Sequence, residues 1–186
     1  KEFADVYKGD YAHFTLKEIS EQPDSISQAG NNDQIQQFVD YIKQAKNLYI
    51  TGSGTSYNAA EIAKYLMSKF AKIKINTVIA SELPFSPDDI ERDSTLIAIS
   101  QSGESADVLE AVKIAKESNA KILSIVNLLN SSLSQQSSLA IGLNCGPEIG
   151  VAATKSIFCL LFSISILSLK ELFSVFFSEV KLEILT

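Results

Sequence analysis

The stretch Thr95-Leu-Ile-Ala-Ile-Ser100, which continues as Gln101-Ser-Gly-Glu-Ser105, decides the fold of this protein. Its first six residues form a continuous apolar run, which is typical of a strand covered on both faces in a parallel sheet. A serine-rich turn follows, and then a helical pattern from about residue 104 to 118, with Val108 and Val112 spaced for burial. A buried strand that leads through a tight turn into an amphipathic helix indicates a βα unit.

The same alternation continues on both sides of this unit. Further short apolar segments indicate strands at residues 47–52, 74–80, 121–126 and 139–143. Helical patterns lie at 33–46, 55–70 and 131–137, and a long helix is expected to begin near Val151. Strands that alternate with helices predict an α/β fold, here a doubly wound, mostly parallel five-stranded sheet with helices on both faces.

Length and composition favour a single core. The chain has 186 residues, of which 46% are hydrophobic, and both values suit one domain. Residues 1–30 have the character of an N-terminal arm, in which Phe14–Ser20 is expected to form a short helix ended by Pro23. Residues 31–186 are expected to form the single domain.

Doubly wound folds bind ligands outside the carboxyl ends of their strands, near a topological switch point. That rule selects the loops 52–56, 100–105 and 144–151. The net charge is −6 and Arg92 is the only arginine, so no basic patch indicates binding to nucleic acid or to an acidic membrane. An anion bound by this chain must therefore be held by backbone amides, hydroxyl groups and helix N-termini.

The first loop reads Gly52-Ser-Gly-Thr-Ser-Tyr57. Gly54 lets the backbone approach a ligand closely, and the hydroxyl groups of Thr55 and Ser56 can donate hydrogen bonds to an oxyanion. An ordinary strand-to-helix turn with a serine or threonine N-cap explains the same residues equally well. The loop lacks both the ending of a P-loop and the third glycine of a dinucleotide fingerprint.

The second loop offers three serine hydroxyl groups at the start of a helix. Ser102 is expected to be the N-cap, and Ser100 and Ser105 can converge with it above the free N–H groups and the positive end of the helix dipole. The alternative is a capped helix without a ligand, but a cap needs one hydroxyl group and this turn has three. We therefore favour a phosphate site.

The third loop, Asn144-Cys-Gly-Pro-Glu-Ile-Gly-Val151, is irregular and presents backbone groups near Val151. Glu148 is the candidate for a general acid or base. A carboxylate in the first turn of a helix also stabilises the dipole, so the structural role remains open beside the catalytic one.

Other kinds of site find little support in the sequence. His13 is the only histidine and lies in the arm, so neither a histidine triad nor a metal site is expected. Cys145 and Cys159 form no metal-binding pattern, and we interpret them as reduced thiols of a cytoplasmic protein. The apolar run 157–169 is too short to span a membrane and is expected to be a core helix.

Four ordered segments resemble a known family. They read His13-Phe-Thr-Leu-Lys-Glu-Ile-Ser-Glu-Gln-Pro23, Gly54-Thr-Ser-Tyr57, Ser100-Gln-Ser-Gly-Glu-Ser105 and Gly146-Pro-Glu-Ile-Gly-Val-Ala-Ala-Thr-Lys155. They resemble the sugar isomerase (SIS) domain family and, more narrowly, the isomerase portion of the glutamine–fructose-6-phosphate aminotransferases. The likeness covers residues 13 to about 170 and implies a flavodoxin-like SIS fold.

The resemblance also implies roles for single positions. The phosphate-binding loop of the family matches Ser100, Gln101, Ser102 and Ser105, the residues that touch the phosphosugar match Thr55 and Ser56, and a main-chain contact to the sugar matches Val151. The departures from the family are Ser53 in place of cysteine, Ser105 in place of threonine and Ala153 in place of serine.

The family converts fructose 6-phosphate and glutamine to glucosamine 6-phosphate without a metal or other cofactor. Its catalytic base and ring-opening histidine lie in a second SIS half, so the resemblance implies that this chain corresponds to the first half and is inactive alone. The implied partners are fructose 6-phosphate or glucosamine 6-phosphate, and a second SIS half or a second copy in a homodimer.

Three alternatives to this interpretation remain. The chain could be a regulatory SIS module that senses a phosphosugar, although residues 1–46 show no helix-turn-helix pattern. It could be an SIS isomerase for another phosphosugar, although Glu148-Ile-Gly-Val151 favours the aminotransferase. It could also be a structural subunit with an empty site.

Overall fold

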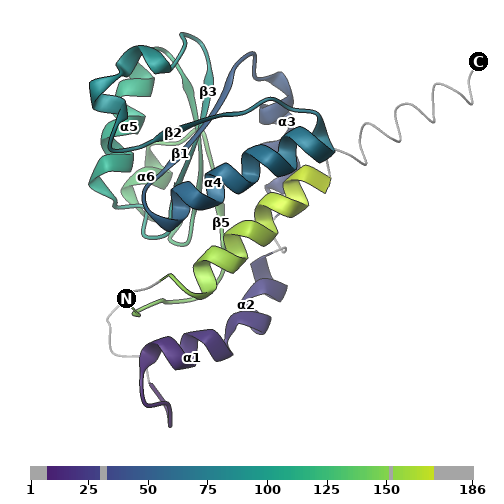
Figure 1. The fold of residues 1–186 in the computed structure, drawn as a ribbon, viewed down its shortest axis with the longest axis vertical. Coiled ribbons are helices and arrows are strands. Elements are labelled where there is room, and N and C mark those ends of the chain that lie inside the picture. The colour runs from purple at the N-terminus through teal and green to yellow at the C-terminus, as the bar shows by residue number, and fades with distance from the viewer. Residues whose placement is uncertain (1–7, 30–32, 151–152, 170–186) are drawn as a thin grey trace, which may run out of the picture.

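The computed structural model of this protein describes residues 8–29, 33–150 and 153–169. Within these ranges the chain forms a central sheet with helices packed on its two faces, and a pair of short N-terminal helices lies beyond one end (Figure 1). The α/β architecture expected from the alternating sequence pattern is confirmed.

All four strand pairings in the central sheet are parallel. The strands are β1 (Leu48–Gly52), β2 (Asn76–Ile79), β3 (Thr95–Ser100), β4 (Lys121–Val126) and β5 (Leu139–Gly142). Their spatial order is β2-β1-β3-β4-β5, which is the flavodoxin-like order. The direction of winding reverses between β1 and β3, so the topological switch point lies between these two strands.

One face of the sheet is covered by α3 (Ile35–Gln44), α4 (Thr55–Leu66) and a helix over residues 155–169. Because side chains alternate along a strand, Ile97 and Ile99 of β3 point into this layer. The fully buried Phe38 of α3 fills the same layer. The expected helix over 55–70 is confirmed, since α4 continues as a π-helical turn, Met67–Ala71.

The other face is covered by α5 (Ala106–Glu117), the short α6 (Ser132–Gln135) and two 3-10 turns, Leu83–Phe85 and Pro87–Asp89. Leu96 and Ala98, the alternate residues of β3, point into this second layer. Helices thus cover both faces, as the doubly wound interpretation predicts.

The apolar segment 157–169 is part of the core, as expected. It lies in the helix over 155–169, whose buried side chains include Leu160, Ile164 and Leu167. The helix begins at Lys155, later than the start expected near Val151, because residues 153 and 154 are described and are not helical. Among the described helices, none combines the length and the apolar character needed to cross a bilayer.

The N-terminal segment contains two helices where one was expected. These are α1 (Phe14–Ser20) and α2 (Gln22–Ala29). The expected helix Phe14–Ser20 is confirmed, but Pro23 does not end it; it lies in the first turn of α2, where its missing N–H breaks no helical hydrogen bond. The division of the chain into an arm and a domain at residue 30 stays a prediction.

The pair α1–α2 is anchored by polar contacts to the third loop and to the helix over 155–169. Lys155 is only 3% exposed, and its Nζ lies 2.6 Å from Oε2 of Glu21. Ser25 donates to the carbonyl oxygen of Cys145 over 3.4 Å, and Gln22 donates to that of Thr154 over the same distance. Burial opposes ionisation of Glu21, but the ammonium groups of Lys155 and Lys17 outweigh it and lower the pKa of Glu21.

Removing the charge of Glu21 should therefore destabilise the protein in a pH-dependent way. The lowered pKa means that the carboxylate stabilises the fold fully above its ordinary value of 4.5, and that this contribution is lost as the pH falls further. We expect Glu21→Gln to lower the free energy of unfolding by about 1–2 kcal/mol at pH 7, because Lys155 is buried while Glu21 is partly solvated. Urea denaturation at pH 7, 5 and 3 measures this difference.

The matched control is Glu110→Gln. Glu110 lies 3.2 Å from Lys113 on the surface of α5, and both side chains are exposed. Such a pair contributes less than about 0.5 kcal/mol. The anchoring role is contradicted if Glu21→Gln lowers the free energy of unfolding as little as Glu110→Gln does, or if its effect does not become smaller towards pH 3.

Candidate functional site

The switch point brings the first and second loops to the same edge of the sheet. Parallel pairing sets Thr51 of β1 beside Ala98 of β3, so both strands end at this edge. The chain continues into α4 on one side and into α5 on the other. The N-termini of two helices therefore lie next to each other, and each presents N–H groups and the positive end of a helix dipole.

The first loop enters α4 through a backbone conformation that suits glycine. Gly54 has φ 55° and ψ −126°, and it precedes α4 without offering a side-chain cap. Thr55 and Ser56 are the first residues of the helix, and Thr55 is exposed while Ser56 is half-buried. The capping alternative is thus not what the structure shows, because no side chain caps α4.

In the second loop, the hydroxyl groups of Ser100 and Ser105 face each other at 2.9 Å. The Oγ atom of Ser100 also accepts a hydrogen bond from the N–H of Gly103 at 3.1 Å. The backbone of Ser105 is the N-cap of α5, but its side chain makes no capping bond. These two hydroxyl groups converge as expected, in front of a helix N-terminus that no side chain caps.

Ser102 does not have the position expected from the sequence. The N-cap of α5 is Ser105, because Gly103 and Glu104 still belong to the turn and the helix begins at Ala106. The Oγ atom of Ser102 instead accepts from the N–H of Glu104 at 3.1 Å. Ser102 thus lies on the rim of the loop, where its hydroxyl accepts from Glu104 and keeps its own proton available to a ligand.

The second loop is supported from below by the start of α6. Gly103 is buried with φ 70°, and a Cβ at this position would collide with the side chain of Ser131. Its carbonyl oxygen accepts from the N–H of Leu133 at 3.0 Å, and Oε1 of Glu104 accepts from that of Ser132 at 2.7 Å. The sequence pattern gave no sign of this support, since residues 131–133 lie beyond the next strand.

Glu148 of the third loop lies at the N-terminus of the helix over 155–169. Its Oε1 accepts from the N–H of Thr154 at 2.7 Å and of Lys155 at 2.9 Å, and from the hydroxyl of Thr154 at 3.0 Å. This is the dipole-stabilising role that the sequence left open beside catalysis. Val151, expected to present its backbone to a ligand, lies outside the described residues.

Asn127, which the sequence analysis did not select, holds the start of the third loop. It follows β4 directly, and its side chain donates to the carbonyl oxygen of Gly146 at 2.7 Å. The same side chain accepts from the N–H of Cys145 at 3.2 Å. Its place after a buried strand, at the same sheet edge as the other loops, was the signal that could have found it.

The first and second loops meet the residues on either side of the third loop at a narrow cleft of about 20 Å³. The residues that line it are Thr55, Ser56, Ile99, Gln101, Leu143, Ala153, Ser156, Ile157 and Leu160. The structure thus brings together Thr55, Ser56 and Gln101 with residues that flank Val151. The volume admits one water-sized group, so a larger ligand would have to lie across the mouth of the cleft.

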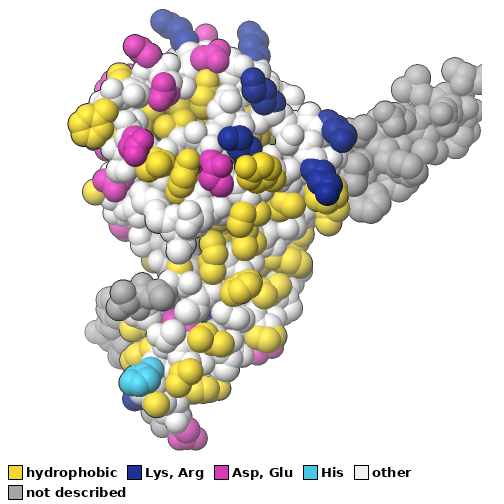
Figure 2. Space-filling model, in the orientation of Figure 1, with side chains coloured by type: hydrophobic (Ala, Val, Ile, Leu, Met, Phe, Trp, Pro, Cys, Tyr) yellow, Lys and Arg dark blue, Asp and Glu magenta, His cyan; other side chains and the backbone are white. Residues whose placement is uncertain are grey.

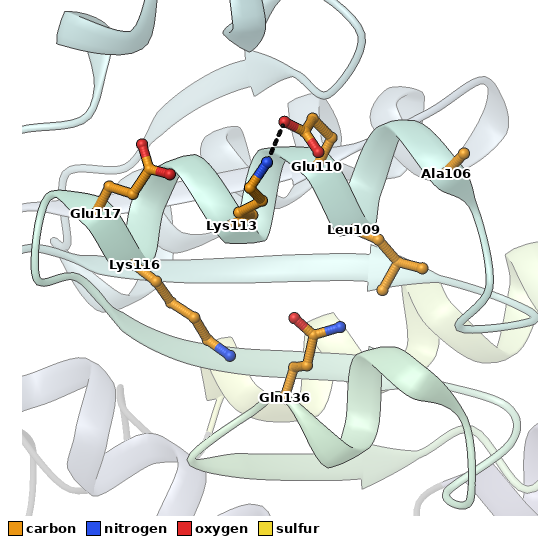
Figure 3. A pocket seen from close by; sticks show the side chains of 7 residues that line it. All are labelled: Ala106, Leu109, Glu110, Lys113, Lys116, Glu117 and Gln136. Carbon is orange, nitrogen blue, oxygen red and sulfur yellow. Dashed lines mark hydrogen bonds and ion pairs between the residues drawn. The ribbon is translucent and has the colours of Figure 1, made fainter.

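A larger hollow of about 530 Å³ lies elsewhere, over the outer surface of α5 and the end of α6 (Figure 3). Its charged side chains are two lysines and two glutamates, and Lys113 pairs with Glu110 across one helical turn. None of the candidate residues lines it. Charges of both signs on an open surface offer an anion no net attraction.

Two carboxyl groups near the loops have a lowered pKa. The backbone N–H of Ser132 stabilises the charged form of Glu104, and a hydrogen bond from Thr77 does the same for Glu61 of α4. Neither shift moves a carboxyl group towards the neutral range in which a general base works best. Among the described residues, no cluster of three or more acidic, histidine or cysteine side chains is arranged to hold a metal ion.

Comparison with known proteins gives a consistent result. Residues 41–170 match the family described as the SIS domain. The glutamine–fructose-6-phosphate aminotransferase (isomerizing) of Pyrococcus horikoshii is 43% identical over 152 residues, which are 80% of this chain and 25% of that protein. The enzyme of the same name from Thermotoga maritima is 39% identical over 172 residues, 88% of this chain and 28% of that protein. The chain thus spans about a quarter of the length of these relatives.

A solved structure shows the same arrangement. The C-terminal domain of glucosamine-fructose-6-phosphate aminotransferase from Francisella tularensis superimposes with a TM-score of 0.81 and 37% sequence identity. The match covers 90% of this chain and 49% of that one.

The support beneath the second loop can be tested at Gly103. We expect Gly103→Ala to destabilise the fold by about 1–3 kcal/mol more than Gly146→Ala, because only the first substitution forces a methyl group into a filled space. Gly146 is a matched control with φ 71°, and a Cβ there makes only an ordinary contact with Lys155. Thermal and urea unfolding of both variants measure the difference, and equal losses would show that positive φ alone explains the effect.

Proposed function

Since the chain belongs to the SIS domain family, we propose that it binds a phosphosugar, with the phosphate held by the second loop and the sugar lying towards the first and third loops. The observation that carries this proposal is the facing pair of Ser100 and Ser105, 2.9 Å apart, in front of the uncapped N-terminus of α5. The neighbouring N-terminus of α4, with Thr55 and Ser56, completes the site.

The geometry suits a phosphate dianion without a positively charged side chain. In the described structure the two facing hydroxyl groups share one hydrogen bond, in which either is the donor, and an anion placed between them and the helix would accept a hydrogen bond from each. The N–H groups in the first turn of α5 and the dipole add to this attraction. Ser102 on the rim and Gln101 in the cleft provide further donors.

The sugar part is proposed to lie across the mouth of the narrow cleft. Thr55, Gln101 and Ser156 offer polar groups there, whereas Ala153 offers none. The resemblance to the family includes a main-chain contact at Val151, and this contact is part of the proposal. With fewer polar groups on the sugar side, recognition should depend mainly on the phosphate.

We further propose that the chain forms the first SIS half of an isomerase portion that makes glucosamine 6-phosphate from fructose 6-phosphate and glutamine. The names of the relatives support this proposal. The relatives themselves are about four times longer than the segment that matches this chain. Glu148 is occupied at a helix terminus and His13 is exposed ahead of α1, so neither is a well-placed base. We expect binding without turnover in this chain alone, and a cytoplasmic location in keeping with its reduced thiols.

An apolar surface supports pairing with a second SIS half or a second copy. Exposed hydrophobic side chains follow α4 and the helix over 155–169, and they gather in one region of Figure 2. They are Ile62, Tyr65, Phe158, Phe162 and Leu169. A set of large apolar groups on two adjacent helices is typical of a protein interface.

Serine substitutions test the phosphate loop. We expect Ser105→Ala and Ser102→Ala each to weaken fructose 6-phosphate binding about 10- to 100-fold, because a hydrogen bond to a charged group contributes about 1.5–3 kcal/mol. The free energy of unfolding should fall by about 1 kcal/mol or less, since neither side chain caps the helix. Calorimetric or NMR titration measures the affinity.

The matched control for these variants is Ser118→Ala at the C-terminal end of the same helix. It should bind like the unmodified chain. If the affinity of both loop variants is unchanged, the second loop is not the phosphate site.

The ligand itself provides a separate test. We expect fructose to bind at least about 100-fold more weakly than fructose 6-phosphate, because most of the polar groups address the phosphate. Inorganic phosphate should compete with fructose 6-phosphate and perturb the same amide resonances in α5. Equal affinity for the neutral and the phosphorylated sugar would contradict the proposal.

A further inference from the structure

We propose that Glu18 of α1 is a positioning residue of the phosphosugar site, which fixes the end of the third loop and thereby the following residues, Ala153 and Ser156, that form one wall of the cleft. This inference rests on the proposed function, which assigns the cleft to the sugar. It adds a residue from the N-terminal helices, more than 120 residues away from the loop in sequence.

Glu18 is a charged residue in a place where charge is costly. It is only 3% exposed, and it lies on a short helix whose neighbours Leu16 and Ile19 are exposed. A buried carboxylate is retained only where hydrogen bonds compensate for its lost hydration. The burial of an acidic side chain beside exposed apolar ones indicates that α1 is oriented by what Glu18 contacts.

The side chain of Glu18 contacts the end of the third loop and Thr154 just after it. Its Oε1 accepts from the N–H groups of Ile149 at 2.5 Å and Gly150 at 2.9 Å. Its Oε2 lies 3.4 Å from the hydroxyl oxygen of Thr154, whose one proton is shared between Glu18 and the nearer carboxylate of Glu148. One carboxylate therefore holds the loop on both sides of residues 151 and 152.

Gly150 shows how closely this part of the loop approaches α1. A Cβ on Gly150 would lie 2.5 Å from Oε2 of Glu18 and 3.1 Å from the hydroxyl oxygen of Thr15. Any side chain larger than hydrogen at this position would therefore push the carboxylate away from the loop. The backbone φ of Gly150 is not in the left-handed region, so backbone conformation does not require a glycine here. The glycine is needed because a side chain would have no space.

A short path connects these contacts to the cleft. Thr154 is bound from one side by Glu18 and from the other by Glu148, whose carboxylate also accepts from the N–H of Lys155. The residues on either side of this pair, Ala153 and Ser156, line the cleft together with residues of the first and second loops. Moving the loop away from Glu18 would therefore shift the wall that faces the sugar, while the phosphate loop would keep its own support.

The role of Glu18 can be separated from the attachment of the helices. Glu21 pairs with the ammonium group of Lys155, whereas the N–H groups of Ile149 and Gly150 are bound by Glu18. Loss of the Glu21 charge removes the pairing with Lys155 but leaves the carboxylate of Glu18 in place to bind those two amides. Glu21→Gln is thus a matched control from the same helix pair.

The experiment is an NMR titration of the full chain with fructose 6-phosphate and, separately, with inorganic phosphate. For Glu18→Ala we expect affinity for fructose 6-phosphate to fall about tenfold, while affinity for inorganic phosphate stays within about twofold, since only the sugar wall moves. Glu18→Gln keeps an acceptor for the amides and should recover most of the affinity. Amide hydrogen exchange at Ile149 and Gly150 should accelerate in Glu18→Ala and not in Glu21→Gln.

A second pair of variants keeps the test independent of the stability of Glu18→Ala. Gly150→Ala alone should weaken fructose 6-phosphate binding. In a chain that already carries Glu18→Ala, adding Gly150→Ala should reduce the affinity by a smaller factor, because the carboxylate that the new methyl group would meet is gone. Additive effects would contradict a direct contact between the two positions.

Three results would overturn the inference alone: unchanged affinity in Glu18→Ala, an equal loss for phosphate and phosphosugar, or an equal loss in Glu21→Gln. The proposed function on which this inference rests is tested by a different result. If the unmodified chain does not distinguish fructose 6-phosphate from fructose, then the proposed function fails, and the inference fails with it.

Discussion

The parallel pairing of β1 with β3 is the interaction on which the rest of the structure depends. Register between Thr51 and Ala98 makes both strands end at one edge of the sheet, and the order of the strands reverses there. Two chain segments must leave this edge in opposite directions, towards α4 on one face and α5 on the other. The gap between them, with a helix N-terminus on each side, is a consequence of the topology before any side chain is considered.

An acidic chain with one arginine can still hold an anion in such a gap. Backbone N–H groups and hydroxyl groups carry no formal charge, so they attract a phosphate without the desolvation cost of a buried ammonium or guanidinium group. The side chain of Ser105 turns from α5 towards Ser100, which leaves the helix terminus uncapped. A capping hydroxyl would contribute about 1 kcal/mol to stability, so leaving the cap unmade is consistent with a terminus reserved for a ligand.

Acidic residues have a complementary structural use in this protein. Glu18 and Glu104 accept hydrogen bonds from backbone N–H groups of distant segments, Glu148 accepts from those at the start of the helix that follows it, and Glu21 binds a buried lysine. Each carboxylate fixes one loop or helix start near the carboxyl edge of the sheet. The segments that border the cleft are therefore supported from outside, and the polar groups that line the cleft itself are uncharged: the hydroxyl groups of Thr55, Ser56 and Ser156 and the amide of Gln101, beside apolar side chains.

The sequence by itself determined the class of fold, the five strands and the three loops at their carboxyl ends. It could do so because apolar periodicity, glycine and serine turns and strand-to-helix alternation are local properties, readable within ten or fifteen residues. It also selected Ser100, Ser105, Thr55 and Ser56, because the turns that carry them follow predicted strands directly. Only the tertiary structure decided that Ser105 and not Ser102 precedes α5, that Ser131 fills the space beneath Gly103, and that Glu18 binds the backbone of Ile149 and Gly150. These contacts join segments up to 132 residues apart, and no local pattern encodes which distant backbone a buried carboxylate will meet once the helices pack.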